Sequence, residues 1–218
     1  MAARPVKATA IAIALFTLIL TACATSQSPP PTAPEHPSAP ELSEEEQWEQ
    51  HLQILNTLQE WRVRGKVAYR LTDDAGSASL DWQQLGSESQ LRLSGPLGVG
   101  STRISNEGAL LRVERDGIAR LYPADAAPWL PEGQLLPVPI DAIRYWLRGM
   151  PAPDRTLEDL QLADALAESL TQDGWEINYA SFTEQQGLQL PRRLTLRAPD
   201  IELELRIILR DWDIPPPR

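Results

Sequence analysis

Residues 91–104 have the sequence LRLSGPLGVGSTRI, which predicts two strands joined by a glycine-rich loop. The first residues alternate leucine with polar side chains, the period-two pattern of a strand with one buried face. Proline and glycine then interrupt the strand. Leu97 lies at the centre of the loop, and around it stand Gly95, Pro96 and Gly98. Because turn centres usually carry Asn, Asp or Ser, this leucine either folds back under its own loop or is presented to an apolar partner.

The composition excludes several classes of function. The chain has 218 residues and a formal net charge of −10, which argues against nucleic-acid binding because that needs a basic patch. The single cysteine, Cys23, excludes a disulfide framework. His36 and His51 are the only histidines, so neither a metal site nor a Ser/His/Asp set is expected in the folded domain. We therefore expect no cofactor and no enzyme, with a tethered periplasmic enzyme as the least favoured hypothesis.

Residues 1–22 predict a lipoprotein signal peptide. Arg4 and Lys7 form a positive segment, and the apolar run over 8–20 is too short to span a bilayer comfortably. Leu-Thr-Ala-Cys then ends at Cys23 and resembles a bacterial lipobox, in which the cysteine is acylated and becomes the new N-terminus. An ordinary signal peptide cleaved nearby is the alternative.

The residue after the cysteine and the composition that follows it indicate where the mature chain goes. Ala24 is not the aspartate associated with retention in the inner membrane of enteric bacteria, so the lipobox resemblance implies the outer membrane. Residues 23–42 hold the acylated cysteine and a proline-rich stretch that cannot pack a core. As an extended tether the proline-rich stretch over 24–40 reaches on the order of 50 Å from the membrane anchor.

The folded domain is expected over residues 43–214, with a C-terminal tail over 215–218. Ser43 followed by glutamates predicts the start of an amphipathic helix. Short alternating segments separated by tight turns then predict an antiparallel meander. We expect a mainly β (α+β) fold in which the meander curves into an incomplete barrel. The expected strands cover 61–71, 77–84, 91–94, 102–106, 109–114, 118–122, 166–171, 175–182, 190–197 and 201–209.

Residues 123–149 interrupt this meander. A short helix is expected over 124–130, before Pro131. A second helix is expected to contain Ile140 and to end at Gly149. A helical insertion within a meander suggests a lid over one face of the sheet.

Taken in chain order, the motifs of this sequence resemble those of the LolB family of outer-membrane lipoprotein receptors, over about residues 48–212. Each motif is weak alone, and their order and spacing are specific. They are Cys23, Trp48, Arg64-Gly65, Trp82-Gln83-Gln84, Leu91-Arg92-Leu93 with Gly95-Pro96-Leu97-Gly98, Tyr145-Trp146-Leu147-Arg148-Gly149 with Pro151, Gly174-Trp175 with Tyr179, Leu190-Pro191 with Leu194, and Trp212.

The resemblance implies a receptor on the periplasmic side of the outer membrane. Such a receptor accepts acylated lipoproteins from a LolA-like periplasmic carrier and inserts them into the inner leaflet. The family's protruding loop leucine corresponds to Leu97, which would contact outer-membrane phospholipid. The alternative is a related half-barrel lipoprotein that binds lipid or senses mislocalised lipoproteins without inserting them. We expect a monomer that binds no nucleic acid.

The resemblance also implies an apolar cavity between sheet and lid that receives acyl chains. Residues on apolar faces of the expected strands and lid are the candidates for its walls. These candidates are Trp82, Leu91, Leu93, Trp146, Leu147 and Trp175. For any of the tryptophans, ordinary core packing is the alternative.

Overall fold

The structure, a computed structural model, describes residues 42–96, 100–107, 110–123, 127–128, 135–136 and 138–215. Residues 42–218 form one compact unit with its own hydrophobic core. The buried core residues that the structure describes run from Trp48 to Ile214, so a chain that begins at residue 42 contains all of them. No helix in the described ranges is long and apolar enough to cross a membrane.

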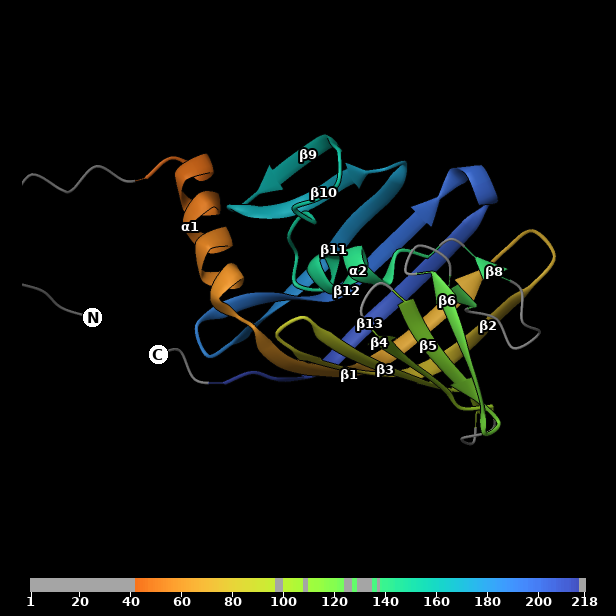
Figure 1. The fold of residues 1–218 in the computed structure, drawn as a ribbon. Helices are drawn as coiled ribbons and strands as arrows, with labels where there is room; N and C mark the ends of the chain where they lie inside the picture. The colour runs from red at the N-terminus through yellow and green to blue at the C-terminus, as the bar shows by residue number, and fades with distance from the viewer. Residues whose placement is uncertain are drawn as a thin grey trace, which may run out of the picture. The chain divides into compact units, whose positions relative to one another are not determined.

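Two helices and a series of strands make up the described part of the chain (Figure 1). The elements are α1 (Glu44–Thr57), β1 (Glu60–Arg70), β2 (Ala75–Leu85), β3 (Glu88–Ser94), β4 (Thr102–Glu107), β5 (Leu110–Arg115), β6 (Ile118–Pro123), β7 (Ala127–Pro128), β8 (Leu135–Leu136), α2 (Ile140–Trp146), β9 (Leu157–Ala163), β10 (Leu166–Gln172), β11 (Trp175–Gln185), β12 (Leu188–Ala198), the 3-10 turn η2 (Pro199–Ile201) and β13 (Leu203–Asp213).

One antiparallel sheet of 11 strands contains nearly all of these strands, in the order β6-β5-β4-β3-β2-β1-β13-β12-β11-β10-β9. Strands β1 and β13 pair in the middle, so the first and last strands of the domain join its two halves. Strands β6 and β9 are the two edges, and the sheet is open. The predicted antiparallel sheet that does not close into a barrel is confirmed.

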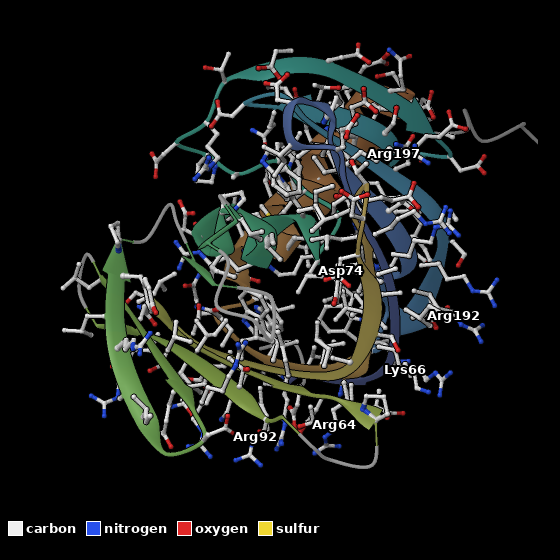
Figure 2. The ribbon with its side chains drawn as sticks, turned by 90° about the vertical axis from the view of Figure 1, so that its right-hand side faces the viewer. Arg64, Lys66, Asp74, Arg92, Arg192 and Arg197 are labelled. Carbon is white, nitrogen blue, oxygen red and sulfur yellow. The ribbon has the colours of Figure 1, made fainter. Side chains whose placement is uncertain are left out.

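The sheet curls around α2, which lies on its concave side (Figure 2). Gly65 in β1 permits a close approach of β13. A Cβ atom at this position would lie 2.1 Å from the carbonyl oxygen of Ile208, so only glycine fits. The register of β1 against β13 shifts between Arg64 and Gly65. Such a bulge increases the local twist of a strand, which bends the sheet.

Helix α1 begins where the sequence predicts. The side chain of Ser43 accepts a hydrogen bond from the Glu46 backbone N–H at 3.2 Å. Glu46 Oε2 accepts one in return from the Ser43 backbone N–H at 2.8 Å. This capping box satisfies two backbone donors at the helix start. Trp48 and Leu55 are buried on one face of the helix, as expected for an amphipathic helix.

Helix α2 is the second predicted helix, and its apolar side faces the sheet. Ile140, Ile143 and Trp146 are buried. Gly149 lies in the turn after the cap residue Leu147, with φ of +84°, a left-handed conformation that favours glycine. The predicted helix is present, but it ends at Trp146, three residues before the predicted Gly149.

Two further local expectations are wrong. Ala127–Pro128 form β7 and pair with β8 instead of belonging to a short helix, while 124–126 and 129–130 lie outside the described residues. Pro128 has no backbone N–H to continue a helical ladder. The last strand, expected from Ile201, begins at Leu203 because Pro199–Ile201 form a 3-10 turn.

Candidate functional site

The concave side of the sheet contains an apolar hollow of about 460 Å³ beside the loop that follows β3. Its volume lies within the range of roughly 300–1,000 Å³ that is usual for small-molecule sites. Strands β1, β2 and β3 supply half of the lining residues. The apolar hollow is lined by Val67, Tyr69, Gly76, Ser77, Ala78, Leu93, Gly95, Pro96, Gly100, Thr102, Arg115 and Asp116.

Small residues on β2 leave the space for this hollow. Ala78 pairs with Val67 of β1, and Gly76 pairs with Tyr69. The Tyr69 ring lies against Gly76, where a Cβ would be only 2.7 Å from the ring. The Tyr69 hydroxyl donates a hydrogen bond to Asp74 Oδ2 at 3.1 Å, which holds the ring in place. A larger side chain at either β2 position would therefore fill the hollow or displace its wall.

Polar groups on the opposite wall satisfy one another. Arg115 Nε donates a hydrogen bond to Thr102 Oγ1 at 2.9 Å, between β5 and β4. Thr102 is buried. A buried polar group is costly only when it has no partner. An apolar ligand in the hollow therefore would not leave this hydroxyl unpaired.

The loop between β3 and β4 starts at the edge of the hollow. Gly95 and Pro96 line it directly after the end of β3, and Gly100 lines it before β4 begins. Leu97 and Gly98, the other two residues predicted to act at the membrane, lie outside the described residues.

Comparison with known proteins identifies the domain. Residues 59–212 match the family of the outer membrane lipoprotein LolB. The chain belongs to the LolB family. The LolB of Pseudomonas putida (strain GB-1) is 38% identical over 170 residues, which cover 77% of this chain and 80% of the relative. The LolB of Pseudomonas aeruginosa (strain LESB58) is 38% identical over 166 residues, covering 76% and 80%.

A solved LolA superfamily protein from Nitrosomonas europaea is similar with a TM-score of 0.47 and 10% identity, covering 82% of this chain and 96% of that one.

Membership of the LolB family confirms the predicted class of protein. The family is one of outer-membrane lipoproteins that act in lipoprotein localisation, together with LolA and lipoprotein cargo. The chain is therefore an outer-membrane lipoprotein receptor and not an enzyme. The alternative of a half-barrel sensor that does not insert lipoproteins is not favoured, because the relatives carry the name outer-membrane lipoprotein LolB.

The residues predicted as cavity walls occupy two different environments in this LolB domain. Leu93 lines the apolar hollow. The other candidates are buried in the core. Among them, Trp82 stacks on Trp61 with ring centroids 6.1 Å apart, and Trp146 lies against Trp175 at 5.8 Å. The buried candidates outside the hollow's lining are Trp82, Leu91, Trp146, Leu147 and Trp175.

Hydrogen bonds of Gln172 fasten the end of α2 to the sheet. Gln172 is fully buried in β10. Its Oε1 accepts hydrogen bonds from Trp146 Nε1 at 2.9 Å and from the Ala152 backbone N–H at 2.8 Å. Its Nε2 donates to the Ala152 carbonyl at 3.0 Å. The LolB tryptophan in α2 is thus held by a buried polar partner rather than facing open space.

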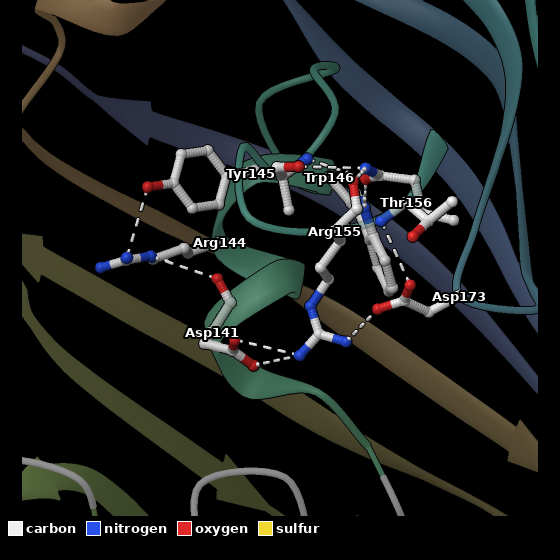
Figure 3. Close-up of polar contacts among 9 residues, drawn as sticks. Asp141, Arg144, Tyr145, Trp146, Arg155, Thr156 and Asp173 are labelled. Carbon is white, nitrogen blue, oxygen red and sulfur yellow. Dashed lines mark hydrogen bonds and ion pairs between the residues drawn. The ribbon is translucent and has the colours of Figure 1, made fainter. Parts of the chain in front are cut away.

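An ion-pair bridge fastens the start of α2 (Figure 3). Arg155 Nη2 donates hydrogen bonds to both carboxylate oxygens of Asp141, each at 3.0 Å. Arg155 Nη1 donates a hydrogen bond to Oδ2 of Asp173, in the β10–β11 turn, at 2.8 Å. Both ends of α2 are therefore tied to the half of the sheet that contains β10.

Arg148 joins the segment after α2 to the end of α1. It is buried, and its NH1 group donates to the carbonyls of Leu55 and Leu58 at 2.9 and 3.1 Å. Burial lowers the pKa of Arg148 to about 10. The guanidinium stays charged at neutral pH, and the carbonyl oxygens at the end of α1 solvate it.

Sequence reasoning missed Val67, Tyr69 and Ala78 as walls of the hollow. The available signal was the pair of small residues, Gly76 and Ala78, at inward positions of β2 beside a glycine-rich loop. Among the residues that the structure describes, no group of three or more His, Cys, Asp or Glu side chains could hold a metal ion.

Proposed function

We propose that this LolB-family protein accepts the acyl chains of lipoproteins from a LolA-like carrier in the apolar hollow and delivers them to the inner leaflet of the outer membrane. The observation that carries the proposal is the position of the hollow. It opens on the concave side of a LolB domain and shares Gly95 and Pro96 with the β3–β4 loop. The hollow that receives the acyl chain would then lie next to the loop that delivers it to the membrane.

The energetics of an acyl chain explain why such a receptor is needed. A chain of about fifteen methylenes gains on the order of 12 kcal/mol on leaving water, at roughly 0.8 kcal/mol for each methylene. Free release into the periplasm is therefore unfavourable by the same amount. The acyl chain has to pass from the carrier's cavity to the apolar hollow and from there to the bilayer, and a series of increasing affinities needs no added energy.

Anchoring is the second part of the proposal. Cleavage after residue 22 would leave an acylated Cys23 as the N-terminus, and residues 24–42 would serve as the tether. Several acyl chains on one residue give stable membrane anchoring. The folded domain over 43–214, followed by the tail 215–218, would then act as a monomer beside the membrane that receives its cargo.

The β3–β4 loop is the proposed site of membrane contact. Leu97 follows directly after Pro96, a residue at the edge of the hollow. A leucine transferred from water to a bilayer gains about 1.5–3 kcal/mol. Inserting this residue into outer-membrane phospholipid would bring the hollow's edge to the membrane surface, so that the acyl chain crosses little water.

Fatty-acid binding tests the proposed role of the hollow. The chain that begins at residue 42 should bind a fluorescent long-chain fatty acid saturably. Ala78→Trp places a large ring in the hollow and should weaken binding at least about tenfold. Ser79→Trp is the matched control, because Ser79 is the next residue of β2 and its side chain is exposed on the other face.

Two results would contradict the proposal. A correctly folded wild-type domain that binds no fatty acid would exclude acyl binding altogether. Equal binding by the Ala78→Trp and Ser79→Trp proteins would place the acyl chain outside the apolar hollow.

A further inference from the structure

The convex face of the sheet carries a recess of about 340 Å³ at β12 and β13, on the side away from α2. We call it the arginine recess. All three of its arginines are exposed, and Figure 2 shows Arg192 and the nearby Lys66 pointing outward from the sheet. The recess is lined by Thr183, Arg192, Arg193, Ile208 and Arg210.

An irregularity in β12 places two consecutive arginines on this face. Ser181 of β11 pairs with Arg193, and the next residue, Phe182, pairs with Pro191. Arg192 is therefore an additional residue in β12. In a regular strand, neighbours point to opposite faces, so Arg192 would point into the core. The bulge redirects its side chain to solvent, which is a known use of bulges near functional sites.

The third arginine, Arg210, lies on the outward face by the regular alternation of β13, at a second irregularity. In β1, Arg64 pairs with Asp211 and Gly65 pairs with Leu209, so Arg210 has no partner in the ladder. It is the additional residue of that bulge, and its side chain is exposed. The bulge in β12 thus adds Arg192 to a face where Arg193 and Arg210 already point outward.

The recess forms where the β12–β13 ladder ends. The pairing of these strands runs from Ala198 and Leu203 to Arg193 and Ile208 and is not continued beyond that pair. Arg192 and the residues after Ile208 in β13 therefore flank an opening between the strands instead of continuing the ladder.

None of the three arginines has a carboxylate partner within the part of the chain that the structure describes. Other arginines on the convex face do form ion pairs with carboxylates: Arg62 pairs with Asp81, and Arg197 pairs with Glu204. Unpaired like charges repel one another when they are gathered in one recess. In a protein with a net charge of −10, three such cations without an acid indicate that an external anion completes the site.

The chemistry of the lining favours a phosphate over a protein partner. The planar guanidinium matches phosphate oxygens with paired hydrogen bonds, and the Thr183 hydroxyl adds a further donor. Protein interfaces have an apolar centre, whereas Ile208 is the one large aliphatic side chain in this lining.

We propose that the arginine recess binds a phosphate group and that this phosphate belongs to an anionic phospholipid headgroup. The identification of the lipid rests on the proposed function, because only a protein that works at a membrane meets such headgroups.

The recess lies level with the β3–β4 loop. Arg193, Ile208, Lys66, Ser79 and Ser94 occupy one row across five adjacent strands. Four strand spacings of about 4.8 Å place the ends of this row roughly 19 Å apart. A loop that enters the membrane just beyond Ser94 would therefore bring the recess close to the headgroup layer, and Lys66 lies between the two.

Vesicle binding tests this proposal with the chain that begins at residue 42. Wild type should sediment with vesicles of phosphatidylglycerol and phosphatidylcholine, and much less with phosphatidylcholine alone. The triple variant Arg192→Gln, Arg193→Gln, Arg210→Gln should lose about 100-fold in partitioning, at roughly fivefold for each cation near an anionic surface. All three side chains are exposed, so the thermal unfolding temperature should change little.

A second triple variant controls for net charge. Gln50→Glu, Gln53→Glu and Gln161→Glu change the charge by the same amount at exposed positions away from the recess. It should bind vesicles within about threefold of wild type. An equal loss in both variants would show that only net charge matters and would overturn the recess as a site.

Two further measurements separate the sources of phosphate and the two proposals. Inorganic phosphate should compete with the vesicles for wild type more strongly than chloride at equal ionic strength; no difference between them would overturn phosphate recognition. Polyglutamate is compared with phosphate at the same concentration of charge. If it competes as strongly as phosphate does, the recess instead binds an acidic protein partner. The triple arginine variant should still bind fatty acid, because the recess and the apolar hollow lie on opposite faces of the sheet. If the wild type binds vesicles but no fatty acid, the proposed function is refuted and the arginine recess is not.

Discussion

Replacing Gln172 by leucine tests whether buried hydrogen bonds hold α2 against the sheet. The carboxamide of Gln172 makes hydrogen bonds to Trp146 Nε1, the Ala152 N–H and the Ala152 carbonyl at 2.9, 2.8 and 3.0 Å. Leucine has a similar volume, so the change removes these bonds and creates little empty space. The three partner groups would remain buried without a hydrogen bond.

The expected loss of stability follows from those three groups. Each buried group left without a partner costs about 1–3 kcal/mol. We expect Gln172→Leu to lower the free energy of unfolding by about 3–6 kcal/mol after partial relaxation. Total stabilities of about 5–15 kcal/mol are usual, so the variant should be close to unfolding at physiological temperature.

Urea denaturation of the chain that begins at residue 42, followed by tryptophan fluorescence, measures this loss. The midpoint should fall while the slope of unfolding free energy against urea stays unchanged. Gln161→Leu is the control, because Gln161 is exposed in β9 and should change stability by less than about 0.5 kcal/mol. A loss below about 1 kcal/mol for Gln172→Leu would refute the view that this residue holds α2 in place.

Three further outcomes are expected. Mass spectrometry of the membrane fraction should find a di- or triacylated peptide that begins at Cys23; a mature chain that begins elsewhere would contradict the anchor. Leu97→Glu should leave the unfolding temperature nearly unchanged and still accept lipoprotein, but it should fail to deliver lipoprotein to vesicles; an unfolded variant would mean that the leucine belongs to the core. Hydrogen bonds from Arg62 lower the pKa of Asp81, so this pair stabilises the protein above the carboxyl's ordinary pKa and the contribution is lost as pH falls through the lowered value. Asp81→Asn should therefore cost at most about 1 kcal/mol at pH 7 and nothing in strong acid, as urea titrations at both pH values would show.

Elements with one strong period were predictable from the sequence. Ser43 followed by glutamates located α1, because a capping serine and acidic residues in the first turn favour a helix start. The alternating aliphatic residues of β13 located that strand, and Gly149 indicated the end of α2 to within three residues. In each case the local preference and the final environment of the residues agree.

The walls of the hollow were not predictable in this way. Val67 and Ala78 occupy inward positions of their strands, and so does Trp82. Alternation shows which face of a strand points inward, but not what covers that face. Trp82 meets Trp61 and is packed, whereas Ala78 is small and meets open space. That difference depends on residues from other strands, which no local pattern contains.

The arginine recess depends on features that period-two patterns do not show. Arg192 and Arg193 are adjacent, so a regular strand would place them on opposite faces. Only the pairing with β11 shows that Arg192 is an additional residue. Two consecutive arginines inside an otherwise alternating strand were the available signal of the bulge.

The location of the acyl chain after transfer is the central claim, and photocrosslinking measures it most directly. A lipoprotein with a photoreactive acyl chain would be loaded on the LolA-like carrier, transferred to the chain that begins at residue 42 and irradiated. The account predicts that mass spectrometry finds the acyl label on residues that line the apolar hollow, chiefly Val67, Tyr69 and Leu93. Crosslinks that avoid these residues and map to α1 or to β9 and β10 would contradict it.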